Sequence, residues 1–373
     1  MLKCELTRRN FLSGAASTTL AACAAPRLSA ATALGAATES AGAGSQRLSL
    51  EQLQKWESLQ YGMFIHFGIT TFVQDGIPDS YAVQRNSPAM RYAPDRLDID
   101  QWVSVARDAG MKYIVLTAKH IAGHCLWPSK HTDYTVANST NKTNVVEEFC
   151  KACGKRGVLP GLYYSSWDNH NRFGSRTRSD MSGPWDQTLG FPKSQENLPP
   201  FTTSLYQGFQ TAQVTELLTQ FGPIAETWID LPGELGRSYR TFLYHHIAAL
   251  QPQTVIMMNS GLPDATEYNV TYAWPSDLVA MEGGVPSGNG PPKWRDIEGK
   301  KYYMPVEVCN PVGKLWFWMP HDKPRPDEAL LKHLNACRTG GTNFLLNVPP
   351  DTHGLIPDDS IAALMRLQKN AGI

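Results

Sequence analysis

Short apolar runs recur along the chain from residue 48 onward, separated by longer stretches that mix polar and apolar residues. Polar residues do not alternate within these runs, which is typical of β-strands covered on both faces. The pattern therefore predicts buried, parallel strands. The eight runs are YGMFIHFG (61–68), KYIVLTAKH (112–120), LPGLYYSS (159–166), AETWID (225–230), TVIMMN (254–259), LVAMEG (278–283), YMPVEVC (303–309) and TNFLLNV (342–348).

Amphipathic stretches with helical periodicity lie between several of these runs. The clearest cover residues 98–110, 204–222, 238–252 and 326–341. Strand–helix alternation continued to eight strands predicts an α/β fold, the (β/α)8 barrel. We expect it to be irregular, because Pro/Gly-rich loops without a helical pattern follow the fifth and sixth strands. The sequence stops soon after the last helical stretch, so we expect no C-terminal β-sandwich.

Polar side chains stand at the ends of the predicted strands. In a (β/α)8 barrel the C-terminal ends of the strands meet at one rim, where the active site is built. A structural hydrogen bond explains one buried carboxylate, but polar residues at eight strand ends predict a lined pocket. These residues are His66, His120, Tyr164, Asp230, Asn259, Glu282, Glu307 and Asn347.

Two carboxylates facing a pocket rich in aromatic rings suit the cleavage of a glycosidic bond. One carboxylate must be ionised, and the other must be protonated to release the leaving oxygen. The sequence shows no metal-ligand spacing, Gly-rich phosphate loop, G-x-S-x-G motif or Cys–His signature. We therefore expect an enzyme without a metal or other cofactor. The 34 basic and 34 acidic residues balance, which argues against nucleic acid as a partner.

The N-terminus differs in composition from the rest of the chain. Arg8 and Arg9 precede an apolar run rich in small residues, so residues 1–23 resemble a twin-arginine export signal. The run is too short to remain as a membrane span. Leu20–Cys23 resembles a lipobox, and two alternatives stay open: a lipid anchor on Cys23, or ordinary cleavage nearby.

Three regions follow from this composition. Residues 1–23 form the export signal, residues 24–47 an Ala/Gly/Ser-rich linker, and residues 48–373 the catalytic barrel. The predicted location is outside the cytoplasm, in the periplasm, with membrane attachment if the lipobox cysteine carries lipid.

Six sequence blocks, in register over roughly residues 50 to 370, together resemble glycoside hydrolase family 29, the α-L-fucosidases. The resemblance implies a retaining exo-glycosidase that acts on an oligosaccharide or glycoconjugate through a covalent glycosyl intermediate on Asp230. It also implies sugar contacts from His66, His120, Tyr164 and Trp228. The blocks are YGMFIHFGITTF, AGMKYIVLTAKH, HCLWPSKHTDYTV, GLYYSSWDNH, QVTELLTQFGPIAETWID and GTNFLLNVPPDTHGLIP.

The general acid/base is less easily placed, because its loop varies within the family. Glu282 ends the sixth strand, where some relatives carry this residue, and we favour it. Glu307 is the competitor, with a second interpretation as a buried partner for a nearby amide or cation. Retaining chemistry requires the two carboxyl groups to lie ~5–5.5 Å apart.

Departures from the family pattern concern sugar recognition. Ile121 stands where a second histidine is usual, and Asp79–Ser80–Tyr81 replaces a usual E-W-Y triplet. Asp79 and Tyr81 remain candidate sugar contacts. His124 and Trp167 are candidates to compensate for the lost groups.

Three interpretations therefore stay open. The favoured one is an α-L-fucosidase or a sister enzyme for another α-L-hexose, such as L-galactose or L-glucose. The others are a non-catalytic sugar-binding barrel and an inverting or endo-acting glycosidase. The paired Asp230 and Glu282 oppose a pure binder, which has little use for two neighbouring carboxylates.

The export prediction is testable at Arg8 and Arg9. Replacing both by lysine is expected to leave precursor in the cytoplasm, because the twin-arginine pair is the recognised feature of the signal. Cell fractionation followed by immunoblotting measures this. Export at the wild-type level would contradict the assignment.

Overall fold

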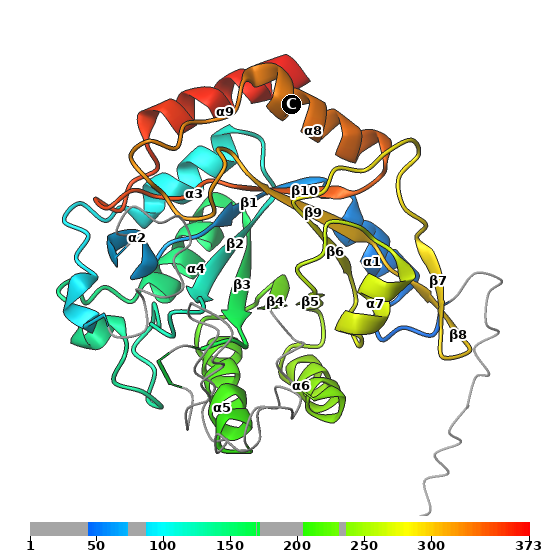
Figure 1. The fold of residues 1–373 in the computed structure, drawn as a ribbon, viewed down its shortest axis with the longest axis horizontal. Coiled ribbons are helices and arrows are strands. Elements are labelled where there is room, and N and C mark those ends of the chain that lie inside the picture. The colour runs from blue at the N-terminus through cyan, green and yellow to red at the C-terminus, as the bar shows by residue number, and fades with distance from the viewer. Residues whose placement is uncertain (1–43, 74–86, 169, 172–203, 231–235) are drawn as a thin grey trace, which may run out of the picture. The chain divides into compact units, whose positions relative to one another are not determined.

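The structure, a computed structural model, describes residues 44–73, 87–168, 170–171, 204–230 and 236–373. Eight parallel strands form one sheet in the order β5-β4-β3-β2-β1-β10-β9-β6, with helices outside the strands (Figure 1). The predicted (β/α)8 barrel is confirmed, and each predicted apolar run contains all or most of one strand of this sheet. The strands are β1 (Tyr61–Ile65), β2 (Tyr113–Lys119), β3 (Leu159–Ser165), β4 (Glu226–Asp230), β5 (Val255–Asn259), β6 (Val279–Glu282), β9 (Val306–Pro311) and β10 (Asn343–Asn347).

Helices occupy all four amphipathic stretches named from the sequence. Within the described residues, none of the helices combines the length and apolar character needed to cross a bilayer. The helices are α1 (Leu50–Glu57), α2 (Thr70–Val73), α3 (Ile99–Asp108), α4 (Val145–Arg156), α5 (Ser204–Gln220), α6 (Arg237–Leu250), α7 (Glu267–Ala273), α8 (Asp327–Thr339) and α9 (Asp358–Ala371), with 3-10 turns η2 (Ala89–Arg91) and η3 (Val136–Asn138).

Two intervals expected to be loops contain regular structure. The first holds α7, whose seven residues are too few to show a helical repeat in the sequence. The second holds an antiparallel hairpin of β7 (Trp294–Ile297) and β8 (Lys300–Tyr303). Its turn residues, Glu298 and Gly299, both have positive φ, as this tight turn requires. Glutamate is an uncommon residue in that conformation, so the sequence carried little signal for the turn.

The ends of the sheet, β5 and β6, are joined through Ser276 and Asp277, the residues just before β6. Asp277, just before β6, accepts the Ile256 N–H at 2.9 Å and donates its own N–H to the Ile256 carbonyl at 2.8 Å. Ser276 Oγ accepts the Met258 N–H at 3.0 Å. Arg47 pairs with the Asp277 carboxylate, so this buried charge is compensated. These contacts supply the hydrogen bonds that a strand ladder would make.

Residues at the end of the predicted linker already contact the barrel. The Ser45 N–H donates to the Lys301 carbonyl at 2.6 Å, and Arg47 donates to the Pro252 carbonyl at 2.6 Å. The preceding residues 1–43, which include the export signal and Cys23, lie outside the described residues.

Alternate residues of each strand face the barrel interior, as the pleat dictates. The interior cluster includes Phe64, Tyr113, Tyr163 and Trp228, whereas neighbours such as Ile114 and Ile229 belong to the cluster packed against the helices. Gly62 makes room for the Tyr113 ring, because a Cβ at Gly62 would lie 2.6 Å from that ring. Large side chains therefore fill the barrel below its rim.

Candidate active site

A single amide joins the two candidate catalytic carboxylates. Asp230, Asn259 and Glu282 end the neighbouring elements β4, β5 and β6. Asn259 Nδ2 lies 2.7 Å from Asp230 Oδ1 and 2.7 Å from Glu282 Oε2, so it donates one N–H to each. The two oxygens are therefore separated by no more than twice 2.7 Å.

Tyr163 fixes the second oxygen of Asp230. Its hydroxyl donates to Asp230 Oδ2, and Asp230 is buried. Burial, followed by the charge of Asp230, raises the pKa of Tyr163 well above its ordinary value, so the phenol stays protonated as a donor. Both oxygens of Asp230 are thus oriented by neutral donors on adjacent strands.

Two uncharged histidines form the side of the site that faces Tyr163. His66, just after β1, lies with Nδ1 2.8 Å from Asn347 Oδ1. Burial lowers the pKa of His66 to about 3. It also lowers the pKa of His120 well below its ordinary value, with nearby His66 as the second cause. The His120 ring stacks on Tyr163 at 5.4 Å.

The tautomer of His66 follows from its partner. Asn347 Nδ2 donates to the Trp316 carbonyl at 2.8 Å, which leaves Asn347 Oδ1 as an acceptor for His66 Nδ1–H. The other ring nitrogen of His66 is then an acceptor, suited to a hydroxyl group. His120 Nδ1 is buried and has no hydrogen-bond partner among the described residues.

Two aromatic residues that the sequence analysis did not single out complete this wall. Trp316 and Phe317 lie in the segment between β9 and α8. Their ring centroids are 5.1 Å and 5.4 Å from the ring centroid of His66. Phe317 also contacts His120 at 4.9 Å. The only sequence signal was the aromatic run LWFW, which packing in the core would explain equally well.

Glu307 lies in the floor of the barrel, below the site. Its carboxylate accepts hydrogen bonds from Tyr113 Oη at 2.6 Å and Trp228 Nε1 at 2.8 Å. The ladder places Glu307 beside Ala280 and places Glu282 beside Cys309. Glu307 is thus two residues, or roughly 7 Å, deeper than Glu282. The structure brings Glu282, and not Glu307, to Asp230 through Asn259.

A second buried acid neighbours Glu307. Glu226 begins β4, is buried, and makes no hydrogen bond through its carboxyl oxygens within the described part of the chain. Burial, and then the charge of Glu307, raises the pKa of Glu226 well above its ordinary value. Burial raises the pKa of Glu307 to about 7. The floor therefore favours a neutral Glu226 beside Glu307.

Tyr164 and Trp228, which the resemblance implied as sugar contacts, are both buried and use their polar atoms within the protein. The Tyr164 hydroxyl donates to Gln213 on α5 at 2.8 Å, so Tyr164 faces the helices while Tyr163 faces the carboxylates. Trp228 is buried with its ring centroid 5.0 Å from that of Phe64, and its indole N–H donates to Glu307. Trp228 therefore supports the site from below.

The remaining predicted residues are distributed as follows. Asp79 and Tyr81 lie outside the described residues. Trp167 is buried in the segment after β3, and Ile121 is buried after β2. His124 lies 2.9 Å from Ser139 Oγ and packs against Tyr134. Among the described residues, no group of three His, Cys, Asp or Glu side chains is arranged to hold a metal ion.

A (β/α)8 barrel with two linked carboxylates at its rim is an arrangement typical of glycoside hydrolases. Comparison with known proteins gives the family. The family model for α-L-fucosidase matches residues 28–369. The chain belongs to the α-L-fucosidase family, which confirms the resemblance stated from the sequence blocks.

Individual relatives agree with this assignment. Alpha-L-fucosidase 1 of Arabidopsis thaliana is 31% identical over 338 residues, which cover 85% of this chain and 58% of the relative. Putative alpha-L-fucosidase 1 of Oryza sativa is 30% identical over 333 residues, covering 85% of this chain and 57% of the relative. The chain thus spans less than two thirds of the length of these curated relatives.

Solved structures support the fold. A putative alpha-L-fucosidase from Bacteroides thetaiotaomicron has a TM-score of 0.67 at 26% identity, covering 88% of this chain and 67% of that one. Alpha-L-fucosidase isoenzyme 1 from Paenibacillus thiaminolyticus also has a TM-score of 0.67 at 26% identity, and the match covers 86% of this chain and 75% of that one.

The buried acid pair predicts a particular pH dependence of stability. Because the folded pKa values of Glu226 and Glu307 are raised, the unfolded chain releases these protons first, and stability falls as pH rises from about 4.5 toward 7. Glu226→Gln mimics the neutral acid, so its stability relative to wild type should increase across this window. Denaturant unfolding at a series of pH values measures this.

Glu51→Gln, at an exposed glutamate on α1, is the matched control and should show no such trend. If the free energy of unfolding changes with pH in the same way for wild type and Glu226→Gln, the assignment of a neutral acid to the barrel floor is contradicted.

Proposed function

We propose that this protein is a retaining, exo-acting α-L-glycosidase that hydrolyses terminal α-L-fucosyl residues of an oligosaccharide or glycoconjugate. The observation that carries the proposal is the sharing of Asn259 between Asp230 and Glu282. Carboxyl groups ~5–5.5 Å apart are typical of retaining enzymes, whereas inverting enzymes need ~6.5–9.5 Å to admit a water molecule. The bound of twice 2.7 Å between the two oxygens supports the retaining class.

In the first step, an Asp230 oxygen attacks the anomeric carbon as the glycosidic bond breaks. Glu282 gives its proton to the leaving oxygen, so the aglycone departs as an alcohol. In the second step, Glu282 takes a proton from water, and the resulting hydroxide displaces Asp230 from the anomeric carbon. Donation from Tyr163 and Asn259 holds Asp230 in place for both steps.

The surroundings of the two carboxyl groups support different roles for them, with Asp230 as the nucleophile and Glu282 as the acid/base. Asp230 is buried, and each of its oxygens accepts a hydrogen bond from a neutral donor, which holds the carboxyl group in the orientation that a nucleophile requires. Glu282 is partly exposed at the rim, where a leaving group and a water molecule have access. Neutral His66 and His120 offer hydrogen-bonding groups without adding positive charge beside the sugar.

Fucose is supported by the family, and a related α-L-hexose is the second candidate. The related α-L-hexose is favoured by the positions of two residues that follow β2. Ile121 is buried and apolar, and His124 is held by Ser139, so neither restores the polar group that family members usually carry there. Comparing kcat/KM for aryl α-L-fucoside and α-L-galactoside distinguishes them. A much higher kcat/KM for the galactoside would make L-galactose, and not L-fucose, the proposed sugar.

Export by the twin-arginine route belongs to the same proposal. Arg8, Arg9 and the apolar run after them support a periplasmic location, and Cys23 supports a lipid anchor.

The assignment of Glu282 predicts a dependence on the leaving group. Glu282→Ala should reduce kcat/KM by ~10²–10⁴-fold on substrates with poor leaving groups, because these need a proton from the acid. Activated aryl fucosides, which leave without that proton, should lose far less in the first step. Steady-state kinetics on a series of aryl α-L-fucosides measures the slope of rate against leaving-group pKa.

Glu307→Gln is the matched control, since it alters the other candidate acid while nearly conserving its shape. It is expected to keep the wild-type slope, even if the overall rate falls. A steep slope in Glu307→Gln together with a wild-type slope in Glu282→Ala would reverse the assignment.

A further inference from the structure

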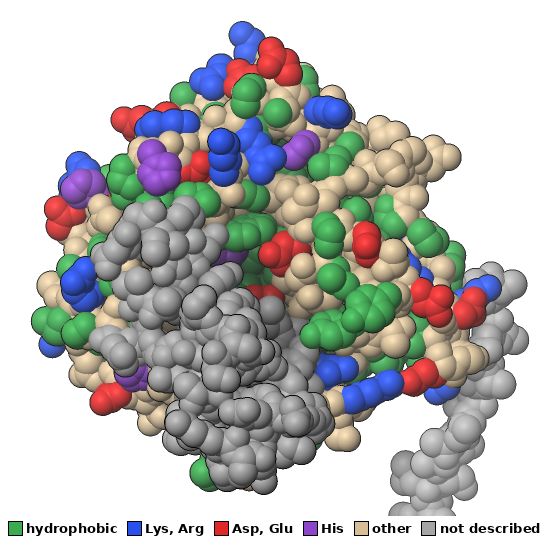
Figure 2. All heavy atoms as spheres, viewed as in Figure 1, with side chains coloured by type: hydrophobic (Ala, Val, Ile, Leu, Met, Phe, Trp, Pro, Cys, Tyr) green, Lys and Arg blue, Asp and Glu red, His purple; other side chains and the backbone are tan. Residues whose placement is uncertain are grey.

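A cavity of about 550 Å³ lies between α7 and β7, apart from the carboxylate pair. Its walls come from two intervals of the chain: α7 lies between β5 and β6, and the β7–β8 hairpin lies between β6 and β9. Figure 2 shows hydrophobic side chains on the surface over α7, where Tyr268 and Tyr272 are exposed. The volume falls in the range usual for small-molecule sites, ~300–1,000 Å³.

Arg295 is the unusual residue of this cavity. Its Nε and Nη2 atoms are buried and have no hydrogen-bond partner within the described chain. Burial lowers the pKa of Arg295, and among the described residues no ion pair with a carboxylate offsets that effect. By contrast, Arg47 and Arg156 pair with Asp277 and Asp100. A desolvated guanidinium without an anion is costly unless a ligand supplies the anion.

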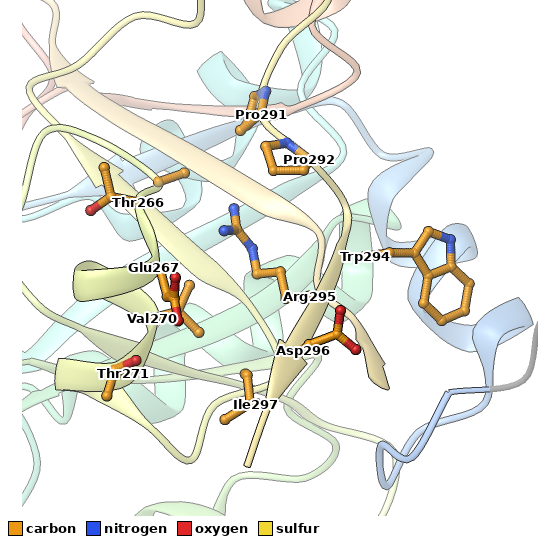
Figure 3. Close-up of a pocket in the computed structure, with 11 residues that line it drawn as sticks. Thr266, Glu267, Val270, Thr271, Pro291, Pro292, Trp294, Arg295, Asp296 and Ile297 are labelled. Atoms are coloured by element: carbon orange, nitrogen blue, oxygen red, sulfur yellow. The ribbon is translucent and has the colours of Figure 1, made fainter. Parts of the chain in front are cut away.

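The arrangement of β7 aims Arg295 into the cavity. Figure 3 shows the guanidinium projecting between Thr266 and Pro292, while the carboxylate of Asp296, which also lines the cavity, points away from it. Successive residues of a strand point to opposite faces, so the Asp296 carboxylate is directed away from Arg295. Arginine presents two N–H groups in a fork that matches a carboxylate or sulfate.

The other lining residues narrow the chemistry of the ligand. Glu267, on the first turn of α7, adds a carboxylate that accepts hydroxyl donors but repels a bare anion. Val270 and Pro292 add apolar surface. A molecule that combines an acidic group, hydroxyl groups and an apolar face satisfies all three features. Acidic saccharides, such as uronic or sialic acids, have this combination.

The cavity is connected to the candidate active site by a short segment. This segment runs from Asn259 to Thr266, and its Leu262 carbonyl accepts the Glu282 N–H at 2.9 Å. Thr266, at the cavity wall, is four positions along the chain from Leu262, a span of at most ~14 Å. A group bound at Arg295 therefore lies near the loop that supports Glu282.

We propose that the cavity between α7 and β7 is a binding site for an acidic saccharide, with Arg295 receiving the anionic group and Glu267 the hydroxyl groups. The proposal rests on the proposed function only in taking a sugar as the ligand. The acidic saccharide is either part of the same glycan as the fucosyl group or a separate molecule.

Isothermal titration tests the binding site directly. The probes are glucuronic acid and N-acetylneuraminic acid, with glucose and sodium sulfate as controls, and with α-L-fucose present to occupy the candidate active site. Both acids should bind the wild-type protein more tightly than glucose or sulfate. Arg295→Gln should weaken their binding about ten-fold or more, since it removes charged hydrogen bonds.

Arg237→Gln is the matched control, because Arg237 is an exposed arginine paired with Glu298 on the neighbouring surface. It should bind the acids as the wild type does. Thermal unfolding should show that Arg295→Gln is at least as stable as wild type without ligand, because the variant lacks a half-buried charge without a partner among the described residues. Equal binding by Arg295→Gln and wild type, no binding of either acid, or equal binding of sulfate would each overturn the proposal.

Kinetics separates the two sources of the ligand. If the acid belongs to the substrate, an acidic fucosylated oligosaccharide should have a lower KM than its neutral counterpart in wild type only, and not in Arg295→Gln. If it is a separate molecule, free acid should change the rate on a simple aryl fucoside, again only in wild type. Binding without any hydrolysis would refute the proposed function alone, whereas hydrolysis without Arg295-dependent binding would refute this inference alone.

Discussion

The amide of Asn259 between two carboxylates is the interaction on which the rest of the site depends. Two nearby carboxylates repel each other, and a protein that places them together must orient both. Asn259 does so with its two N–H groups, one to Asp230 and one to Glu282. The parallel register pairs Asp230 with Asn259, so the strand ladder itself sets this arrangement. The seam between β5 and β6 must close for Glu282 to complete it, and Ser276 and Asp277 make that closure.

The barrel interior supports the rim from below. The pleat places Tyr163 and Trp228 on the inward faces of adjacent strands, with their rings 6.0 Å apart. Trp228 is anchored by Glu307, and Tyr163 is anchored by Asp230. A buried acid in the floor thus fixes the ring that lies beneath Asp230. This cooperation explains why a core position carries a glutamate, a residue that is rarely buried without a partner.

The sequence predicted most of the fold because continuous apolar runs are a strong signal for strands covered on both faces. It also predicted that Asp230 and Glu282 share a site, because both end strands. It named Tyr164 as the residue of the pocket, whereas Tyr163 is the tyrosine that faces inward, since the run LPGLYYSS has no alternation to set the phase. Tyr163 meets Asp230, and Tyr164 meets Gln213. The depth of Glu307 depends on the ladder register, which only the assembled sheet defines.

Loop residues were the least predictable part of the site. Trp316 comes from a segment without regular structure, so no periodicity indicated that it would reach His66. The hairpin that carries Arg295 was hidden by a turn with glutamate at a positive φ. Both cases show tertiary packing, not local pattern, deciding where a side chain lies.

The central claim is that Asp230 is a nucleophile positioned by Tyr163 and Asn259. Trapping the intermediate with an activated 2-deoxy-2-fluoro-α-L-fucoside, followed by mass spectrometry of proteolytic peptides, tests it most directly. The fluorine slows the hydrolysis of the second step, so the sugar should accumulate on a single residue. The account predicts one fluorofucosyl group on Asp230 and none in an Asp230→Asn variant. A label on any other residue, or rapid turnover of an ordinary aryl fucoside by Asp230→Asn, would contradict it.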